Sequence, residues 1–190
     1  MCGITAIFAY HDDAPPVTLR ELSDINQTML NRGPDGDGHW LDNENRIGLA
    51  HRRLAIIDLT AQASQPMTRD SLQGKKDRFR ITFNGEIYNF RALRKELEAK
   101  GVKFTTQSDT EVLIRLYERD GSNMTKKLRG MFAIAIWDDL KEQLFLARDH
   151  FGIKPLYIAD DGHTLCAASQ VKALMTGYRF NGGGPNAAGY

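Results

Sequence analysis

The residue best suited to covalent chemistry is the cysteine at position 2, directly behind the initiator methionine. An initiator methionine is normally removed before a small residue, so we expect Cys2 to become the N-terminal residue. Its α-amine would have a reference pKa of about 7.7–8.0 and could take the thiol proton near neutral pH, directly or through one water. This pairs a nucleophile with a base supplied by the chain terminus. The alternative is a chance residue at a frayed end.

Asn84 and Gly85 could complement such a nucleophile. Attack of a thiolate on a carboxamide builds an oxyanion, which needs hydrogen-bond donors. The Asn84 side-chain amide and the Gly85 backbone N–H are two such donors, and they follow a strand-like run. An Asn-Gly pair between apolar runs is also a strong signal for a hairpin turn. Both interpretations are open at this point.

Charged residues could hold a free amino acid in the same site. Arg53 can bind a carboxylate through two hydrogen bonds, and Asp109, helped by Glu86, can accept hydrogen bonds from an ammonium group. Each has a simpler explanation. Arg53 could be a surface charge, and acids are favoured in the first turn of a helix by the helix dipole.

Strands and helices must position these residues. Apolar or alternating runs predict strands at 4–10, 46–51, 53–59, 78–83, 131–138 and 143–149, and a hairpin over 155–169. Helical spacing predicts helices over 18–30, 89–101 and 108–121, and around 169–175. Antiparallel pairing through short turns is more natural for this order than βαβ repeats, so we expect an α+β layered domain.

Helix ends and one loop carry local signals. Thr18 with Glu21, and Ser108 with Glu111, have the spacing of capping boxes, and Asn89 is placed to cap the helix after it. The segment 32–40 is expected to be a loop, because four of its nine residues are Gly or Pro.

Size and composition indicate one soluble domain. The chain has 190 residues, a formal net charge of +1 and two cysteines. The near-neutral charge gives no reason to expect nucleic acid or a membrane surface as partner. Two cysteines make no disulfide framework, and Cys166 is expected to be a small buried residue. No signal peptide is evident, so we expect a cytoplasmic location.

Seven segments, in this order, closely resemble the glutaminase domain of asparagine synthetase and related class II glutamine amidotransferases. They are MCGITAIF, RGPDGDG, AHRRLAIIDL, FNGEIYNF, SDTEVL, LRGMFAIAIWD and LARDHFGIKPLY. We therefore expect residues 1–175, with Met1 removed, to form a class II glutamine amidotransferase domain. The Gly- and Asn-rich residues 176–190 are expected to be a linker toward an absent synthetase domain.

The resemblance implies an N-terminal nucleophile hydrolase fold, an αββα sandwich of two antiparallel sheets between helical layers. It implies hydrolysis of L-glutamine to glutamate and ammonia through a thioester on Cys2, with Asn84 and Gly85 as the oxyanion hole. It also implies that residues 32–38 form a lid. The implied substrate-binding residues are Arg53 for the carboxylate, the backbone of Leu54, Ala55, Ile56 and Ile57, and Asn84, Gly85, Glu86 and Asp109.

The resemblance also defines what is expected outside the domain. The ammonia would supply an ATP-dependent amidation of aspartate or another carboxylate in a C-terminal synthetase domain. ATP and Mg are expected only there, and no cofactor or metal in this domain. A homodimer is left open. Gln170 stands where relatives usually have a glutamate.

Three other interpretations compete with this one. A papain-like hydrolase would need a histidine base, and none of the five histidines lies in a context that suggests one: His11, His39, His51, His150 and His163. The second alternative is a non-catalytic module that binds glutamine or docks a partner. The run DGDG (35–38) suggests a calcium loop, but the other ligands of that pattern are missing.

Overall fold

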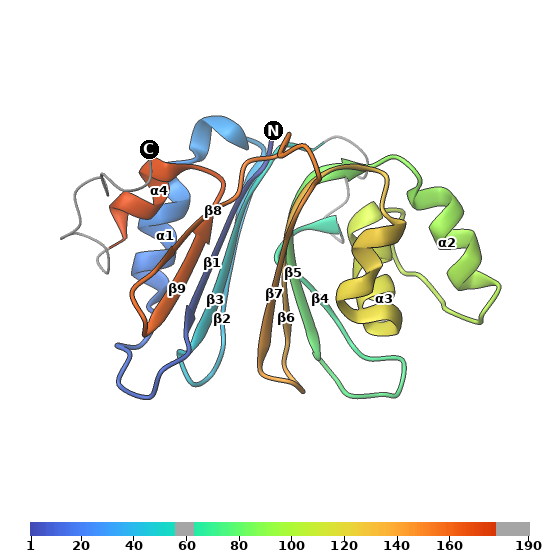
Figure 1. Ribbon diagram of the computed structural model, residues 1–190, viewed down its shortest axis with the longest axis horizontal. Coiled ribbons are helices and arrows are strands. Elements are labelled where there is room, and N and C mark those ends of the chain that lie inside the picture. The colour runs from blue at the N-terminus through green and yellow to red at the C-terminus, as the bar shows by residue number, and fades with distance from the viewer. Residues whose placement is uncertain (56–62, 178–190) are drawn as a thin grey trace.

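Two β-sheets stack face to face, with helices on the outer face of each (Figure 1). The structure is a computed structural model that describes residues 1–55 and 63–177. Every pairing between its named strands is antiparallel. The predicted α+β class and the αββα layering are confirmed.

The first sheet has the strand order β2-β3-β1-β9-β8. Its strands are β1 (Gly3–Ala9), β2 (Gly36–Leu41), β3 (Ile47–Arg53), β8 (Tyr157–Asp160) and β9 (Thr164–Ala168). The central strand is β1, in which Gly3 pairs with Arg52 of β3 and Thr5 pairs with Ala168 of β9. Cys2 therefore stands at the end of the best-anchored strand of the sheet.

The second sheet has the order β4-β5-β6-β7. Its strands are β4 (Met67–Arg69), β5 (Phe79–Ile87), β6 (Gly130–Asp138) and β7 (Gln143–Arg148). Strand β5 continues through Asn84 and Gly85, which pair with Ala133 and Phe132 of β6. A hairpin turn at Asn84-Gly85 is thus wrong, because the ladder to β6 keeps this segment extended.

The helices cover the outer faces. Helices α1 and α4 lie against the first sheet, α3 lies against the second, and α2 packs on α3 further out (Figure 1). They span Leu19–Gln27 (α1), Phe90–Glu98 (α2), Asp109–Asp120 (α3) and Val171–Thr176 (α4), with 3₁₀ segments η1 (Leu30–Arg32) and η3 (Gly121–Lys127). None of the helices in the described ranges has the length and apolar character needed to cross a bilayer.

The predicted caps are formed in part. Thr18 Oγ1 accepts a hydrogen bond from the Glu21 backbone at 3.1 Å, and Ser108 Oγ accepts one from Thr110 at 3.0 Å. The Glu111 side chain, however, bonds to residues preceding Ser108 and to Arg69, so the second reciprocal box is wrong.

Asn89 is the N-cap residue of α2 as predicted, but its side chain makes no capping hydrogen bond. Its side chain donates to the Lys127 carbonyl at 2.9 Å and accepts from the Arg129 backbone at 2.9 Å. It therefore joins the start of α2 to the start of β6, because the carbonyl and N–H of that chain segment compete successfully for the amide.

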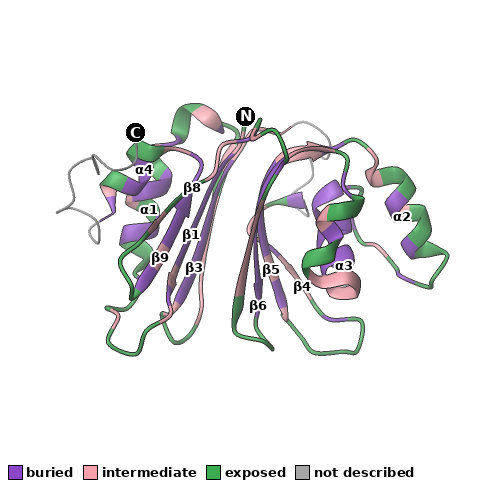
Figure 2. Cartoon of the chain, in the orientation of Figure 1, coloured by how far each residue is buried: buried purple, intermediate pink, exposed green. Residues whose placement is uncertain are grey.

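Three apolar layers hold the sandwich together, and strand β6 shows how. Its Ile134 and Ile136 face α2 and α3, while Ala135 and Trp137 face the other sheet. Alternate residues of one strand thus enter different layers, as the period of two requires. Figure 2 shows buried strands in the middle and helices whose outer faces are exposed.

The expected loop over 32–40 is wrong for most of its length. Strand β2 begins at Gly36 and forms the edge of the first sheet by pairing with β3. A Cβ atom at Gly38 would lie 2.1 Å from the Gln65 carbonyl oxygen. This glycine therefore permits close approach of two backbones, and a run rich in glycine can still pair as an edge strand.

Candidate active site

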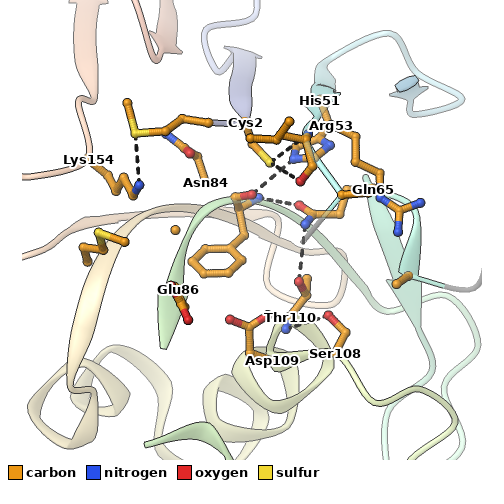
Figure 3. Close-up of a pocket in the computed structure, with 17 residues that line it drawn as sticks. Cys2, His51, Arg53, Gln65, Asn84, Glu86, Ser108, Asp109, Thr110 and Lys154 are labelled. Carbon is orange, nitrogen blue, oxygen red and sulfur yellow. Dashed lines mark hydrogen bonds between the residues drawn. The ribbon is translucent and has the colours of Figure 1, made fainter. Parts of the chain in front are cut away.

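One pocket, at the end of the sandwich where β1 begins, collects the predicted site residues that the structure describes (Figure 3). These are Cys2, Arg53, Leu54, Ala55, Asn84, Gly85, Glu86 and Asp109. They come from the start of β1, the end of β3, the second half of β5 and the first turn of α3. Ile56 and Ile57 lie outside the described residues.

The Cys2 thiol is held against the end of β3. Its Sγ accepts a hydrogen bond from the Leu54 N–H at 3.3 Å and lies 3.5 Å from the Leu54 carbonyl oxygen. The Cys2 carbonyl accepts from Arg32 Nε at 3.0 Å. Burial raises the pKa of the thiol, although the Leu54 hydrogen bond and the charge of the N-terminus oppose the rise. The resting group is therefore the thiol, which needs a base before it can attack.

Asn84 presents an unused donor to this pocket. Its Nδ2 is buried and has no hydrogen-bond partner among the described residues. Leaving a buried amide unpaired costs about 1–3 kcal/mol, so this group is poised for a ligand atom. The neighbouring Gly85 could not be another residue, because its Cβ would lie 2.2 Å from the Met131 carbonyl oxygen.

The pocket has a carboxylate-lined wall. Asp109 Oδ2 accepts from the Ile87 N–H at 3.2 Å, and Glu86 lines the same pocket. Burial raises the pKa of Asp109 to about 6, although the backbone hydrogen bonds oppose this, and the charge of Glu86 adds to the rise. Arg53, which also lines the pocket, donates to Ser64 Oγ at 3.5 Å. A cationic group and two acids in one pocket match the charges of a free α-amino acid.

His51 is the histidine that lines the pocket, and its surroundings in the structure do not suit a base for Cys2. Its ring is buried in the pocket wall, and Nε2 lies 3.2 Å from the Phe83 carbonyl oxygen. Burial lowers the pKa of His51 to about 4, against the effect of that hydrogen bond. The ring is therefore neutral at neutral pH, and Nε2 donates to Phe83, joining the two sheets next to Asn84. Within the described part of the chain, no histidine hydrogen-bonds the Cys2 thiol.

Gln65 is a pocket residue that the sequence analysis missed. Its Oε1 accepts from the Phe83 N–H at 2.6 Å, and its Nε2 donates to Thr110 Oγ1 at 3.3 Å. It thereby connects β5 to the first turn of α3, beside Asp109. It lies within a largely polar stretch of the sequence (60–77), where neither periodicity nor spacing distinguishes it from other polar residues.

Glu111, expected to complete a capping box with Ser108, has different partners and fixes the start of α3. It is fully buried and accepts hydrogen bonds from the backbone and hydroxyl of Thr105 and Thr106, and from Arg69 Nε at 3.0 Å. Burial alone would raise the pKa of Glu111, but the bonds from Thr106 and Arg69 hold it below its ordinary value. The residue keeps a full charge and holds the helix turn that carries Asp109.

Comparison with known proteins adds an independent line of evidence. Residues 1–183 match the family described as "glutamine amidotransferase domain". The chain is 43% identical over 176 residues to asparagine synthetase [glutamine-hydrolyzing] 1 of Bacillus subtilis (strain 168), covering 92% of this chain and 27% of that protein. It is 40% identical over 176 residues to asparagine synthetase B [glutamine-hydrolyzing] of Escherichia coli (strain K12), covering 92% and 30%.

The fold is also found among solved structures. Glutamine phosphoribosylpyrophosphate amidotransferase from B. subtilis, complexed with ADP and GMP, superposes with a TM-score of 0.72 at 24% identity, covering 92% of this chain and 43% of that one. At this identity the likeness concerns the fold. The chain spans less than a third of the length of the two asparagine synthetases named above.

Proposed function

This chain belongs to the glutamine amidotransferase domain family, and we propose that it hydrolyses L-glutamine to glutamate and ammonia through a thioester on Cys2. The observation that carries the proposal is one pocket that holds the Cys2 thiol, the unpartnered Asn84 amide and side chains of both charges. Hydrolysis of a free amino-acid amide requires a nucleophile, a hydrogen-bond donor for the oxyanion, a cationic group for the carboxylate and an acidic group for the ammonium.

The first half of the reaction forms the thioester. Removal of Met1 makes the Cys2 α-amine available, and this amine takes the thiol proton. The thiolate attacks the side-chain carbonyl carbon of glutamine, and the resulting oxyanion is bound by the Asn84 amide and the Gly85 N–H. The C–N bond of the glutamine side chain then breaks. The departing nitrogen takes a proton from the α-ammonium of Cys2 and leaves as ammonia.

The second half releases glutamate. The α-amine, neutral again, takes a proton from a water that attacks the thioester carbonyl, and the same donors bind the second oxyanion. The C–S bond breaks, and the thiol regains its proton. One amine thus serves as base and acid in turn, and no group beyond the pocket is required.

The charged residues select the substrate. Arg53 binds the glutamine carboxylate, and Asp109 with Glu86 accepts hydrogen bonds from its ammonium group. Leu54 and Ala55, and by their position in the sequence Ile56 and Ile57, provide backbone around the carboxylate. A glutamine held at its α-carbon by both poles presents its side-chain amide to Cys2 at a fixed distance.

The fate of the ammonia is proposed from the relatives. Both named asparagine synthetases are more than three times as long as the matched segment, so we propose that a synthetase domain follows residues 1–175 through a linker at 176–190. Most of that linker lies outside the described residues. The synthetase domain would use ATP and Mg to activate aspartate, or another carboxylate, as the ammonia acceptor. We place this pathway in the cytoplasm, with no cofactor in the glutaminase domain.

Two measurements test the proposal. An N-terminal mass determines whether Met1 is removed, and a glutamate-release assay on the same sample measures turnover. We expect turnover in the processed chain, none in Cys2→Ala, and none when an extra residue precedes Cys2. If the processed chain and its Cys2→Ala variant both bind glutamine and neither turns it over, the chain is a binding module. If the extended chain retains full turnover, the terminal amine is not the base.

A further inference from the structure

Lys154 is a buried ammonium group in the catalytic pocket. It lies on the segment after β7, lines the pocket with Cys2 and is 6% exposed (Figure 3). Its backbone is fixed on both sides, because its N–H donates to Asp149 Oδ2 at 2.9 Å and its carbonyl accepts from Arg148 Nε at 2.9 Å. The position of the side chain is therefore set by a rigid turn.

The ammonium has a weak set of partners. Among the described residues, the hydrogen bond found for its Nζ goes to the sulfur of Met1 at 3.1 Å and not to a carboxylate. A thioether is a weak acceptor, and burying a charge without an opposite charge is costly. Removal of Met1 would take even this partner away. Such an arrangement calls for a functional reason.

The reason lies in the group next to it. We propose that Lys154 acts electrostatically on Cys2, disfavouring protonation of its α-amine and favouring the thiolate over the thiol. A nearby positive charge makes an ammonium less stable and a thiolate more stable. At neutral pH a larger fraction of the Cys2 α-amine is then neutral and able to accept a proton, and the thiolate that the transfer produces is stabilised. Lys154 is thus a positioning residue that acts through Cys2. This inference rests on the proposed function for its effect on turnover.

Other charged groups around Cys2 do not replace Lys154. The charge of Lys154 lowers the pKa of the Cys2 thiol more than that of Arg53 does, and Arg53 would be neutralised by the substrate carboxylate. Arg32 donates to the Cys2 carbonyl. On the other sheet and helix, Glu86 and Asp109 would be paired with the substrate ammonium.

Two further titratable groups lie near Cys2, the His51 ring and the α-amine at the chain terminus. His51 is neutral at neutral pH. The charge of the chain terminus is that of the Cys2 α-amine, the group whose protonation Lys154 is proposed to affect. In the loaded pocket Lys154 still lowers the pKa of the Cys2 thiol, and Arg32, which also keeps its charge beside Cys2, acts in the same direction.

The test combines two pH profiles of the processed chain. The first is kcat/KM for glutamine hydrolysis, and the second is the rate of Cys2 alkylation by iodoacetamide without glutamine, with the modified residue identified by mass spectrometry. The variants are Lys154→Met, which keeps length and loses charge, and Lys154→Arg, which keeps charge. Lys172→Met, on the exposed face of α4, is the matched control.

We expect the rising limb of both profiles to move to higher pH by about one unit in Lys154→Met, so that activity at the foot of the limb falls about tenfold. The high-pH plateau should be retained, and Lys154→Arg and Lys172→Met should follow the wild type. A uniform loss at every pH, with both limbs unmoved, would show a structural role and overturn the inference. If Lys154→Met does not fold, Lys154→Gln is measured in the same way.

The two proposals fail separately. If the wild-type chain does not hydrolyse glutamine, the proposed function is wrong, but the alkylation profile still tests the effect of Lys154 on the thiol. If the wild type turns over and neither profile moves in a folded Lys154→Met or Lys154→Gln variant, only the role of Lys154 is wrong.

Discussion

The sulfur of Cys2 lies 3.3 Å from the backbone nitrogen of Leu54, so the first residue before β1 is hydrogen-bonded to the first residue after β3. The register of the two strands sets this contact, because Gly3 pairs with Arg52. The same register fixes the nucleophile relative to Arg53. A slip of one residue would turn every side chain of β1 to the opposite face. The geometry of the pocket is therefore a consequence of the central strand pairing.

Gly85→Ala should damage the proposed oxyanion hole. The new Cβ would lie 2.2 Å from the Met131 carbonyl oxygen and 2.8 Å from the Phe132 Cα, both backbone atoms. Strand β5 must move away from β6, which displaces the Gly85 N–H. We expect kcat to fall about 10²-fold or more and the free energy of unfolding to fall by about 1–3 kcal/mol. Steady-state kinetics and urea unfolding measure the two effects.

A matched control for that variant is Gly36→Ala. It adds the same methyl group to β2, where the nearest atom would be the Arg53 Cβ at 4.0 Å, an ordinary contact. We expect kcat within about twofold of the wild type and stability within about 0.5 kcal/mol. Equal losses in the two variants would show that the methyl group acts without the clash at β6.

Asn84 should matter for turnover and little for folding. Its Nδ2 is buried and has no partner among the described residues, so replacing it with an apolar group gives up no hydrogen bond there. We expect Asn84→Ala to lower kcat about 10²–10³-fold with KM little changed. Its thermal unfolding midpoint should stay close to that of the wild type. A large loss of stability with normal kcat would contradict a role in the transition state.

The sequence predicted the layers and most of the pocket for identifiable reasons. The order of strand-like and helical runs predicts an α+β layered domain, and the resemblance to a known family implies the αββα sandwich. Cys2, Arg53, Asn84 and Asp109 stand in segments long enough to be matched to a family. The sequence did not show where a local turn signal is overridden by pairing with a distant strand. Asn84-Gly85 has the composition of a turn, and only the β6 ladder keeps it extended.

Residues that act through distant contacts could not be predicted. Gln65 joins Phe83 to Thr110, 18 and 45 residues away in the sequence. The burial of Lys154 depends on a turn whose geometry the residue types do not specify. Glu111 was assigned to a capping box because its spacing fits one, whereas the approach of Arg69, 42 residues earlier, gives it a different partner.

Glu111→Gln should destabilise the fold at neutral pH. The carboxylate is fully buried and ion-paired with Arg69 at 3.0 Å, and removing one partner of a buried pair costs about 3–5 kcal/mol. The pKa of Glu111 is held below its ordinary value of 4.5, so its stabilisation is present above that pH and is lost as the pH falls. The difference between wild type and variant should therefore shrink on acidification.

Urea unfolding at several pH values checks this, with Glu98→Gln as the control. Glu98 is paired with Arg94 on exposed helix surface, with 45% of its side chain accessible, where such pairs contribute about 0–1 kcal/mol. If Glu111→Gln and Glu98→Gln lower the free energy of unfolding equally at neutral pH, the buried hydrogen bonds of Glu111 do not stabilise α3 more than an exposed ion pair does.

Asp109→Asn should weaken glutamine binding and stabilise the fold. Burial raises the pKa of Asp109 to about 6 from 3.8. The native state therefore holds its proton more tightly than the unfolded chain, and stability from this group is present below pH 3.8 and lost as the pH rises through about 6. Asparagine avoids this loss and can still accept from the Ile87 N–H, so we expect a gain of up to about 3 kcal/mol at neutral pH and none at pH 3.

The same carboxylate is needed, in its charged form, for the substrate ammonium. We expect KM for glutamine to rise about 10–100-fold in Asp109→Asn, with a smaller change in kcat, because a charged hydrogen bond contributes about 1.5–3 kcal/mol. In the wild type KM should rise as the pH falls through about 6, and this dependence should disappear in the variant. Chemical denaturation across pH 3–8 tests the effect on stability, and KM measured across pH 5–8 tests the effect on binding. A variant that binds glutamine normally would remove Asp109 from the substrate site, whatever its stability.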